Sequence, residues 1–459
     1  MALKTKRELA QEADTLATSF SYVLADHVIY VPTDYETGAE SVTPPDDRKI
    51  WLPLVENDLR IRAARQFGTT FSSEQEYASF RYMVEQNCEL HTEPVDSLLI
   101  KTEQGLRMLT ATGKLTEPTG QFIPNTLRPM LNEDEDLKAE VLEVITEWVS
   151  SDEEAKALLR LLATSLAPHW SAGKYVLLIG NGRNGKSMLM EMLQAIFGKA
   201  NCSSITRQEM SAGKPQVTNL NGKLMNIVFD GPATYLTDSG VEKTLVVGEQ
   251  VAIRRLFKSD QTPVRTNSLF IEGLNQEPKS KDKSSALQAR MVRFFFPNVY
   301  PEDRAFKKRM LSDPYVGALL SLLVDHYVKE EEIGVMLAPT SASTQLELDY
   351  ALRNSKAMQF IKYTQENDPL GAQSLLGMTG TELTAKFRSW RVSEENDIGA
   401  WPEPDVLELF RPELLMRRTT RSQQGKTYHV RVVDQFLPRT TAFINTLEEV
   451  NDTATVVED

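Results

Sequence analysis

The hydrophobic pattern alternates along the chain between a period typical of helices and one typical of strands. In several segments apolar residues recur every three or four positions, which predicts amphipathic helices. Between these segments, short apolar runs rich in β-branched and aromatic residues predict strands. The expected helices are 58–67, 74–85, 134–149, 152–167, 188–197, 302–331 and 381–391, and the expected strands include 27–31, 50–54, 174–179, 223–230 and 266–275.

A glycine-rich stretch, GNGRNGKS at 180–187, lies between the strand expected at 174–179 and the helix expected at 188–197. This placement and the G-x-x-x-x-G-K-S spacing are typical of a loop that binds phosphates. Its glycines let backbone N–H groups point at phosphate oxygens, and the helix N-terminus adds a partial positive charge. Lys186 can reach the β- and γ-phosphates, and the Ser187 hydroxyl can ligate Mg²⁺. The sequence therefore predicts a site for ATP and Mg²⁺ made of Gly180, Asn181, Gly182, Arg183, Asn184, Gly185, Lys186 and Ser187.

Polar residues near three later apolar runs extend this predicted site. Asp230 ends the run that begins at Lys223, where a carboxylate can make a second contact with Mg²⁺. Asn275 follows the next run, where its amide can sense the γ-phosphate or position the attacking water. Arg290 and Arg293 stand beside a Phe-rich strand. Either can be an arginine finger, supplied in trans if the protein forms a ring, or both can be solvated surface cations.

Composition narrows the class of protein. The chain has 459 residues, enough for two or three domains, and its 41% hydrophobic and 25% charged residues are ordinary for a soluble protein. No apolar run approaches the roughly 20 residues of a membrane span, and the N-terminus lacks the apolar core of a signal peptide. Cys88 and Cys202 form no metal-ligand pattern and fit a reducing compartment. We therefore expect a cytoplasmic protein without a membrane partner.

The net charge of −13 argues against a protein coated in nucleic acid, but a ring can gather its basic residues on an inner wall. One segment reverses the sign: between 411 and 440, seven Arg and Lys stand against two acids. This segment has the pattern of a β-hairpin that turns near 423–426. A basic wing that contacts phosphates is one interpretation, and a solvated hairpin or one packed on another subunit is the other. The candidate DNA contacts there are Arg417, Arg418, Arg421 and Lys426.

The order of these motifs resembles the superfamily-three DNA helicases, which are hexameric and AAA+-like. Within them, the chain is most similar to the phage and plasmid primase-helicase group related to the poxvirus primase-helicase. The resemblance covers roughly 96–440 and includes a hairpin at 103–115, the phosphate loop, the acidic strand end, the strand with Asn275, and the Arg-Phe-Pro stretch. We identify no primase signature in roughly the first hundred residues. The resemblance thus implies a helicase part without a primase domain.

The resemblance also implies roles for particular residues. The loop 180–187 is the Walker A motif, Asp230 the Walker B acid, Asn275 sensor 1, and Arg290 the preferred finger, with Arg293 second. The stretch 243–258 is similar to a family segment whose hairpin projects into the channel of the ring, so the implied DNA contacts are Arg254, Arg255, Phe257 and Lys258.

The chain departs from the family pattern at one position in particular. Many members carry a second acid after the Walker B aspartate, whereas Asp230 is followed by Gly231. The general base that activates water is therefore open, with Asp238, Glu242 and Glu249 as candidates.

The implied fold is an α/β P-loop AAA+-like core, a central parallel sheet flanked by helices, with additional modules before and after it. The implied function is a replicative helicase of a phage or mobile element. It moves 3′ to 5′ on single-stranded DNA as a homo-hexamer and acts on forked duplexes. It works in the host cytoplasm, with a separate primase or polymerase as a possible partner. The alternative is an ATP-binding regulatory or assembly protein that acts on DNA without unwinding it. The expected parts are an N-terminal α+β region (1–95), hairpin and helical collar (96–170), ATPase core (171–300), helical linker or lid (301–345), winged-helix-like module (346–445) and disordered acidic tail (446–459).

Overall fold

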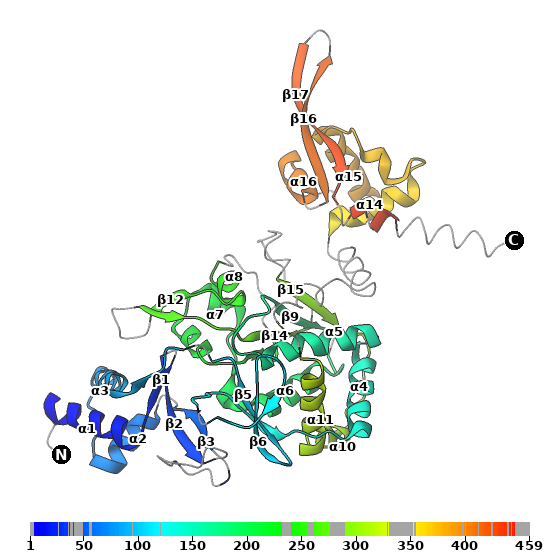
Figure 1. Cartoon of the computed structure of the whole chain (residues 1–459). Helices are drawn as coiled ribbons and strands as arrows, with labels where there is room; N and C mark the ends of the chain where they lie inside the picture. Colours follow the sequence, from blue (N-terminus) through cyan, green and yellow to red (C-terminus); the bar gives the residue numbers. More distant parts are fainter. Residues whose placement is uncertain are drawn as a thin grey trace. The chain divides into compact units, whose positions relative to one another are not determined.

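The chain forms a mixed α/β protein with several separate sheets, seen here in a computed structural model (Figure 1). It divides into two compact units, Met1–Thr340 and Ser341–Asp459. The structure describes residues 4–25, 27–34, 36, 40, 49–54, 57–93, 95–119, 121–149, 151–180, 182–231, 240–254, 261–275, 290–327, 329, 352, 355–395, 399, 401–411, 413–423, 426–437, 440–441 and 443–445. The tail expected at 446–459 lies outside these residues.

The N-terminal part of the first unit is a small four-stranded sheet in the order β3-β2-β1-β4, packed with three helices. Its helices are α1 (Lys6–Ser19), α2 (Asp58–Phe67) and α3 (Glu74–Asn87), and its strands are β1 (Val23–Ala25), β2 (Val28–Asp34), β3 (Lys49–Pro53) and β4 (Glu89–Leu90). Ala13 and Leu16 of α1 and Phe80 and Val84 of α3 are fully buried between these helices. The helices expected from the apolar spacing at 58–67 and 74–85 are thus confirmed.

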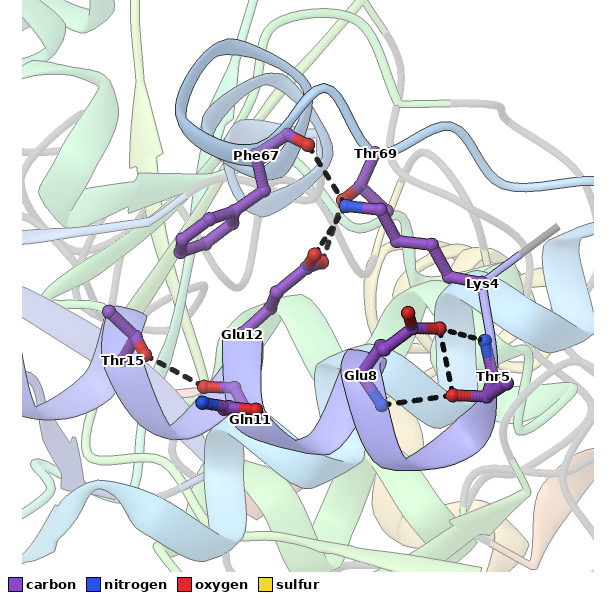
Figure 2. A network of polar contacts seen from close by, with 8 residues as sticks. All are labelled: Lys4, Thr5, Glu8, Gln11, Glu12, Thr15, Phe67 and Thr69. Atoms are coloured by element: carbon purple, nitrogen blue, oxygen red, sulfur yellow. Dashed lines mark hydrogen bonds and ion pairs between the residues drawn. The ribbon is translucent and has the colours of Figure 1, made fainter. Parts of the chain in front are cut away.

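A polar cluster fixes the start of α1 against the end of α2. Figure 2 shows the Lys4 ammonium donating to the Phe67 carbonyl at 2.9 Å and to the Thr69 hydroxyl at 2.6 Å, and pairing with Glu12. Thr5 and Glu8 close a capping box at the first turn of α1, which satisfies backbone N–H groups that the helix cannot. These hydrogen bonds therefore hold the residues just before α1 against the end of α2.

A second four-stranded sheet, in which β5 pairs with β6 in antiparallel and with β8 in parallel, and two helices come next. The sheet has the order β7-β6-β5-β8, with β5 (Leu98–Thr102), β6 (Gly105–Leu109), β7 (Leu115–Thr116) and β8 (Thr126–Met130). Two amphipathic helices follow, α4 (Glu135–Val149) and α5 (Asp152–Ala163), with the 3₁₀ turn η1 (Thr164–Leu166). Their apolar faces lie in the same core cluster as the central sheet, which confirms the helices expected at 134–149 and 152–167.

The central sheet has five parallel strands in the order β10-β11-β14-β9-β15. Residues from α4, α5, α6 and α11 pack on one face, and residues from α7, η2 and α8 pack on the other. Such a two-sided cover buries the middle strands throughout: every residue of β9 is apolar and buried, and β14 is equally buried and apolar except for Glu272. The elements are β9 (Tyr175–Ile179), α6 (Lys186–Asn201), β10 (Cys202–Ser203), α7 (Arg207–Ser211), η2 (Pro215–Leu220), β11 (Met225–Val228), α8 (Gly240–Val246), β14 (Leu269–Leu274), β15 (Met291–Phe295), α10 (Arg304–Met310) and α11 (Asp313–Asp325).

Two local features of this core are a separate hairpin and a break in the helix α6. A separate antiparallel hairpin, β12 (Val251–Arg254) with β13 (Gln261–Val264), leaves the sheet between α8 and β14. Gly198, expected to stop the helix after the phosphate loop, does break it: it has φ +68° and ψ 170°, and a separate short helical stretch continues beyond this kink to Asn201. A Cβ at 198 would meet the Arg128 side chain at 2.4 Å, so the position is also crowded.

The second unit combines helices with a long hairpin. Its elements are α14 (Lys356–Asn367), η4 (Gly371–Leu375), α15 (Gly380–Glu395), α16 (Glu403–Phe410), β16 (Leu414–Gln423) and β17 (Lys426–Phe436). Four aromatic rings meet in its core: Phe360 packs edge to face on Phe387, Trp390 and Phe410, and Phe387 packs edge to face on Phe410. The β16–β17 hairpin extends well beyond these helices (Figure 1), and it confirms the hairpin predicted from the basic segment.

Candidate functional site

The phosphate-loop stretch joins β9 to α6, so the strand–loop–helix context expected for it is confirmed. Gly182, Arg183 and Gly185 all have positive φ, at +90°, +50° and +94°. Gly185 caps the N-terminus of α6, and an added Cβ there would lie 2.5 Å from the Trp148 ring. Both its left-handed backbone and the indole packed against it therefore require glycine. Asn181 lies outside the described residues.

Lys186 is buried at the first position of α6, and its ammonium is held inside the loop. It donates to the Gly180 carbonyl at 2.5 Å and to Asn184 Oδ1 at 2.9 Å, while Asn184 Nδ2 donates to the Phe296 carbonyl at 3.1 Å. Burial lowers the pKa of the Lys186 ammonium, and the nearby charge of Asp230 opposes that shift. Ser187 is exposed on the next position. The loop thus holds one buried cation that is bonded to two oxygen atoms of the loop itself.

The carboxyl ends of neighbouring parallel strands bring three predicted residues to one edge of the sheet. β14 lies between β9 and β11, and Gly180 N–H donates to the Leu274 carbonyl at 3.1 Å. Asn275 directly follows β14 and is exposed beside the loop. Asp230, also exposed, follows β11 by two residues and acts electrostatically on Lys186. Because ligands of open α/β sheets bind outside this edge, the loop, Asp230 and Asn275 form one candidate site.

The two candidate finger arginines lie elsewhere. The Arg290 carbonyl accepts from Tyr175 N–H at 2.7 Å, so Arg290 lies level with the amino end of β9. The loop begins five residues further along β9, about 16 Å away at the usual rise of a strand. Arg293 pairs with Leu177 in the middle of β15. The structure therefore does not bring either arginine to the loop of its own chain.

Two basic hairpins carry the predicted DNA contacts. Arg254 is exposed on β12 opposite Gln261, whereas Arg255, Phe257 and Lys258 lie outside the described residues. In the second unit, Arg417 pairs with Asp434 at 2.9 Å. Arg418 is exposed and stands directly across the ladder from Arg431. Arg421 and Lys426 lie in β16 and β17, near the turn of this hairpin, and their side chains are outside the described part.

A buried charged cluster beneath the site was not expected from the sequence. Glu242 of α8, one of the candidate bases, forms an ion pair with Arg207 of α7 at 2.6 Å, and both side chains are at most 2% exposed. The Arg207 guanidinium also lies over the Tyr175 ring, 5.5 Å from its centroid. Glu272 of β14 is 1% exposed beside them. In the sequence, Glu272 is visible as a single acid inside the apolar run LFIEGL.

The other candidate bases lie elsewhere. Glu249 is exposed after α8, and Asp238 lies outside the described residues. Within the described part of the chain, no group of three or more His, Cys, Asp or Glu could hold a metal ion. None of the helices that the structure describes is long and apolar enough to cross a membrane.

Comparison with known proteins gives one family match. Residues 178–290 match the sequence profile of a family of unknown function, DUF5906, which covers less than half of the chain. No curated protein matches. Similar solved structures include the A form of the apo C-terminal region of NrS-1, at 12% identity and a TM-score of 0.47 over 92% of this chain and 99% of that one. A second apo structure of the NrS-1 C-terminal region has 13% identity and a TM-score of 0.47, over 94% of this chain and 100% of that one.

Proposed function

We propose that the protein is an ATP-dependent DNA helicase or translocase that works as a hexameric ring on single-stranded DNA. The observation that carries the proposal is the Lys186 ammonium, buried in a glycine-rich loop between β9 and α6 and bonded to two oxygens of that loop. An anion that displaced these two oxygens would meet a preformed cation and the N-terminus of a helix. Triphosphate binding with Mg²⁺ fits this set of groups.

Each residue at the carboxyl edge of the central sheet has its own role in ATP hydrolysis. Lys186 binds the β- and γ-phosphates, Ser187 and Asp230 hold Mg²⁺, and Asn275 orients the attacking water. When bound, Mg²⁺ neutralises charge that develops on the phosphate oxygens. Arg290 lies at the opposite end of β9 from the loop, so it serves as a finger only towards the site of a neighbouring subunit. This placement supports a ring in which each site is shared between two chains.

The two hairpins supply the contact with DNA. Arg254 of β12 and its neighbours Arg255, Phe257 and Lys258 contact the strand in the channel, where cations track phosphates and an aromatic ring stacks on bases. The exposed Arg418 lies across from Arg431, and like charges directly opposite on a hairpin repel each other. A phosphate between the two guanidinium groups removes that repulsion, which supports a role for the β16–β17 hairpin on nucleic acid.

Steady-state ATP hydrolysis with and without single-stranded DNA tests the proposal. We expect DNA to stimulate hydrolysis by the wild-type protein, Lys186→Ala to abolish it, and a forked duplex to be unwound only when ATP is present. Hydrolysis without any response to DNA, or ATP binding without hydrolysis, contradicts the helicase proposal. That second outcome favours the alternative, an ATP-gated assembly protein on DNA.

A further inference from the structure

The position after Asp230 has no side chain, and another residue fills the space. A Cβ built on Gly231 would lie 1.8 Å from Oε1 of Glu272 and 2.4 Å from its Cδ. Any side chain at 231 would therefore displace the Glu272 carboxyl group. The Gly231 N–H donates to the Gly273 carbonyl at 3.1 Å, which holds this segment against β14. Gly231 thus makes room for a carboxylate that comes from the adjacent strand.

Glu272 is a carboxylate buried among polar and charged side chains. It is 1% exposed, and the nearby Tyr175 hydroxyl favours its ionised form by hydrogen bonding, which lowers the pKa of the carboxyl group. The groups that face it are Arg207 of α7, Glu242 of α8 and Tyr175 of β9. Arg207 is already engaged by both carboxylate oxygens of Glu242, at 2.6 and 3.4 Å. Burial makes the ionised form of such a carboxyl group costly, and groups perturbed in this way cluster at functional sites.

The neighbours of Glu272 connect it to the proposed ATP site. Its carboxyl group contacts Gly231, which directly follows Asp230, and Asp230 acts electrostatically on Lys186. Glu272 also stands three residues before Asn275 on the same strand. We infer that Glu272 is the general base of ATP hydrolysis, supplied from β14 in place of an acid at position 231. This inference rests on the proposed function.

The step that Glu272 performs is a single proton transfer. A water oxygen forms a bond to the γ-phosphorus as the bond from that phosphorus to the β–γ bridging oxygen breaks. The Glu272 carboxylate takes one proton from this water, so the products are ADP and inorganic phosphate. The proton leaves Glu272 before the next cycle, since the base must be ionised to act again.

The acidity of Glu272 agrees with this role. Burial raises the pKa of its carboxyl group to about 7, the charge of Arg207 opposes the shift, and that of Glu242 adds to it. A base whose pKa lies near the working pH combines a useful ionised fraction with a strong affinity for the proton. An ordinary exposed glutamate would hold a proton far more weakly in neutral solution.

Glu272→Gln tests the inference because it keeps the shape of the side chain and removes the base. We expect the affinity for a fluorescent ATP analogue to stay within about twofold, while kcat falls by about 100-fold or more. Glu302→Gln is the control, because Glu302 is exposed and pairs with Arg304, itself exposed. A folded Glu272→Gln protein that hydrolyses ATP within threefold of wild type overturns the inference.

A relocated acid gives a second and independent test. The double variant Gly231→Glu/Glu272→Gly removes the clash at 231 and returns a carboxylate to the position after Asp230. We expect it to regain at least about tenfold in kcat over Glu272→Gln, as expected for restored base catalysis. A folded double variant as inactive as Glu272→Gln contradicts the inference. If the wild-type protein itself binds ATP without hydrolysing it, the proposed function falls, and this inference falls with it.

Discussion

Replacing Glu272 with glutamine removes a buried charge from the first unit and leaves the packing against Gly231 intact. The pKa of the carboxyl group is about 7 in the folded protein and 4.5 in an ordinary environment. Below 4.5 it is protonated in both folded and unfolded chains, and above 7 the folded chain carries the full cost of the buried charge. The free energy of unfolding of the wild type therefore falls relative to that of the variant as pH rises from 4.5 to 7.

The size of the effect follows from the two pKa values. Each pH unit between them is worth about 1.4 kcal/mol, so the variant gains about 3 kcal/mol over wild type at pH 8 and almost nothing at pH 4.5. For a unit of the size of Met1–Thr340, typical entropies of unfolding convert this gain into about 4 °C of melting temperature.

Scanning calorimetry at several pH values measures this difference, and it resolves the transitions of the two units. Glu302→Gln, at an exposed carboxyl of the same unit, gives the control difference at each pH. The reasoning is refuted if the gap between Glu272→Gln and wild type is the same at pH 5 and pH 8, or if the variant is less stable at pH 8. Either result would mean that Glu272 is stabilised by partners rather than left as a buried charge.

Three further variants test other parts of the site. Glu242→Gln leaves the buried Arg207 guanidinium without its counter-charge, and we expect a loss of about 3 kcal/mol in calorimetry, whereas a loss below 1 kcal/mol would show the ion pair to be dispensable. Gly185→Ala forces a left-handed backbone on alanine and a clash with Trp148, so the Kd for ATP in titration calorimetry should rise about tenfold or more. Unchanged affinity for ATP at an unchanged melting temperature would argue against the loop as the phosphate site. Arg418→Ala should weaken binding of labelled single-stranded DNA and lower the slope of log K against log salt by about 0.7, and a slope equal to that of wild type would place the β16–β17 hairpin away from phosphates.

The sequence predicts the elements around the site well because their signals are local. The strand at 175–179, the glycine-rich loop and the helix after it each follow from residue types within a few positions. Gly198 is a further local signal: a glycine after an apolar helical run predicts the end of the regular helix, and its φ of +68° and ψ of 170° break the helix there. The crowding of this position by Arg128 depends on tertiary packing and is not visible in the sequence.

The contacts between neighbouring strands and helices could not be predicted from the sequence. The charge at 272 and the missing side chain at 231 are both visible in the sequence, forty-one positions apart. Only the pairing of β11 with β14, in the register Val228 to Glu272, brings them together. The ion pair between Arg207 and Glu242 likewise depends on two helices meeting across one face of the sheet. Such pairings are decided by tertiary packing, which a single sequence does not reveal.

The contact between Trp148 and the phosphate loop gives the molecule a built-in optical probe. The indole is 3% exposed, and its ring lies 2.5 Å from where a Cβ of Gly185 would be. Its emission therefore depends on the position of the loop backbone, and under the proposed function a nucleotide that shifts this backbone changes the spectrum. Trp51 and Trp170 lie in the same unit, and Trp390 and Trp401 in the other, so a Trp148→Phe protein supplies the blank. The emission of Trp148 thus reports on the proposed site in the unlabelled protein.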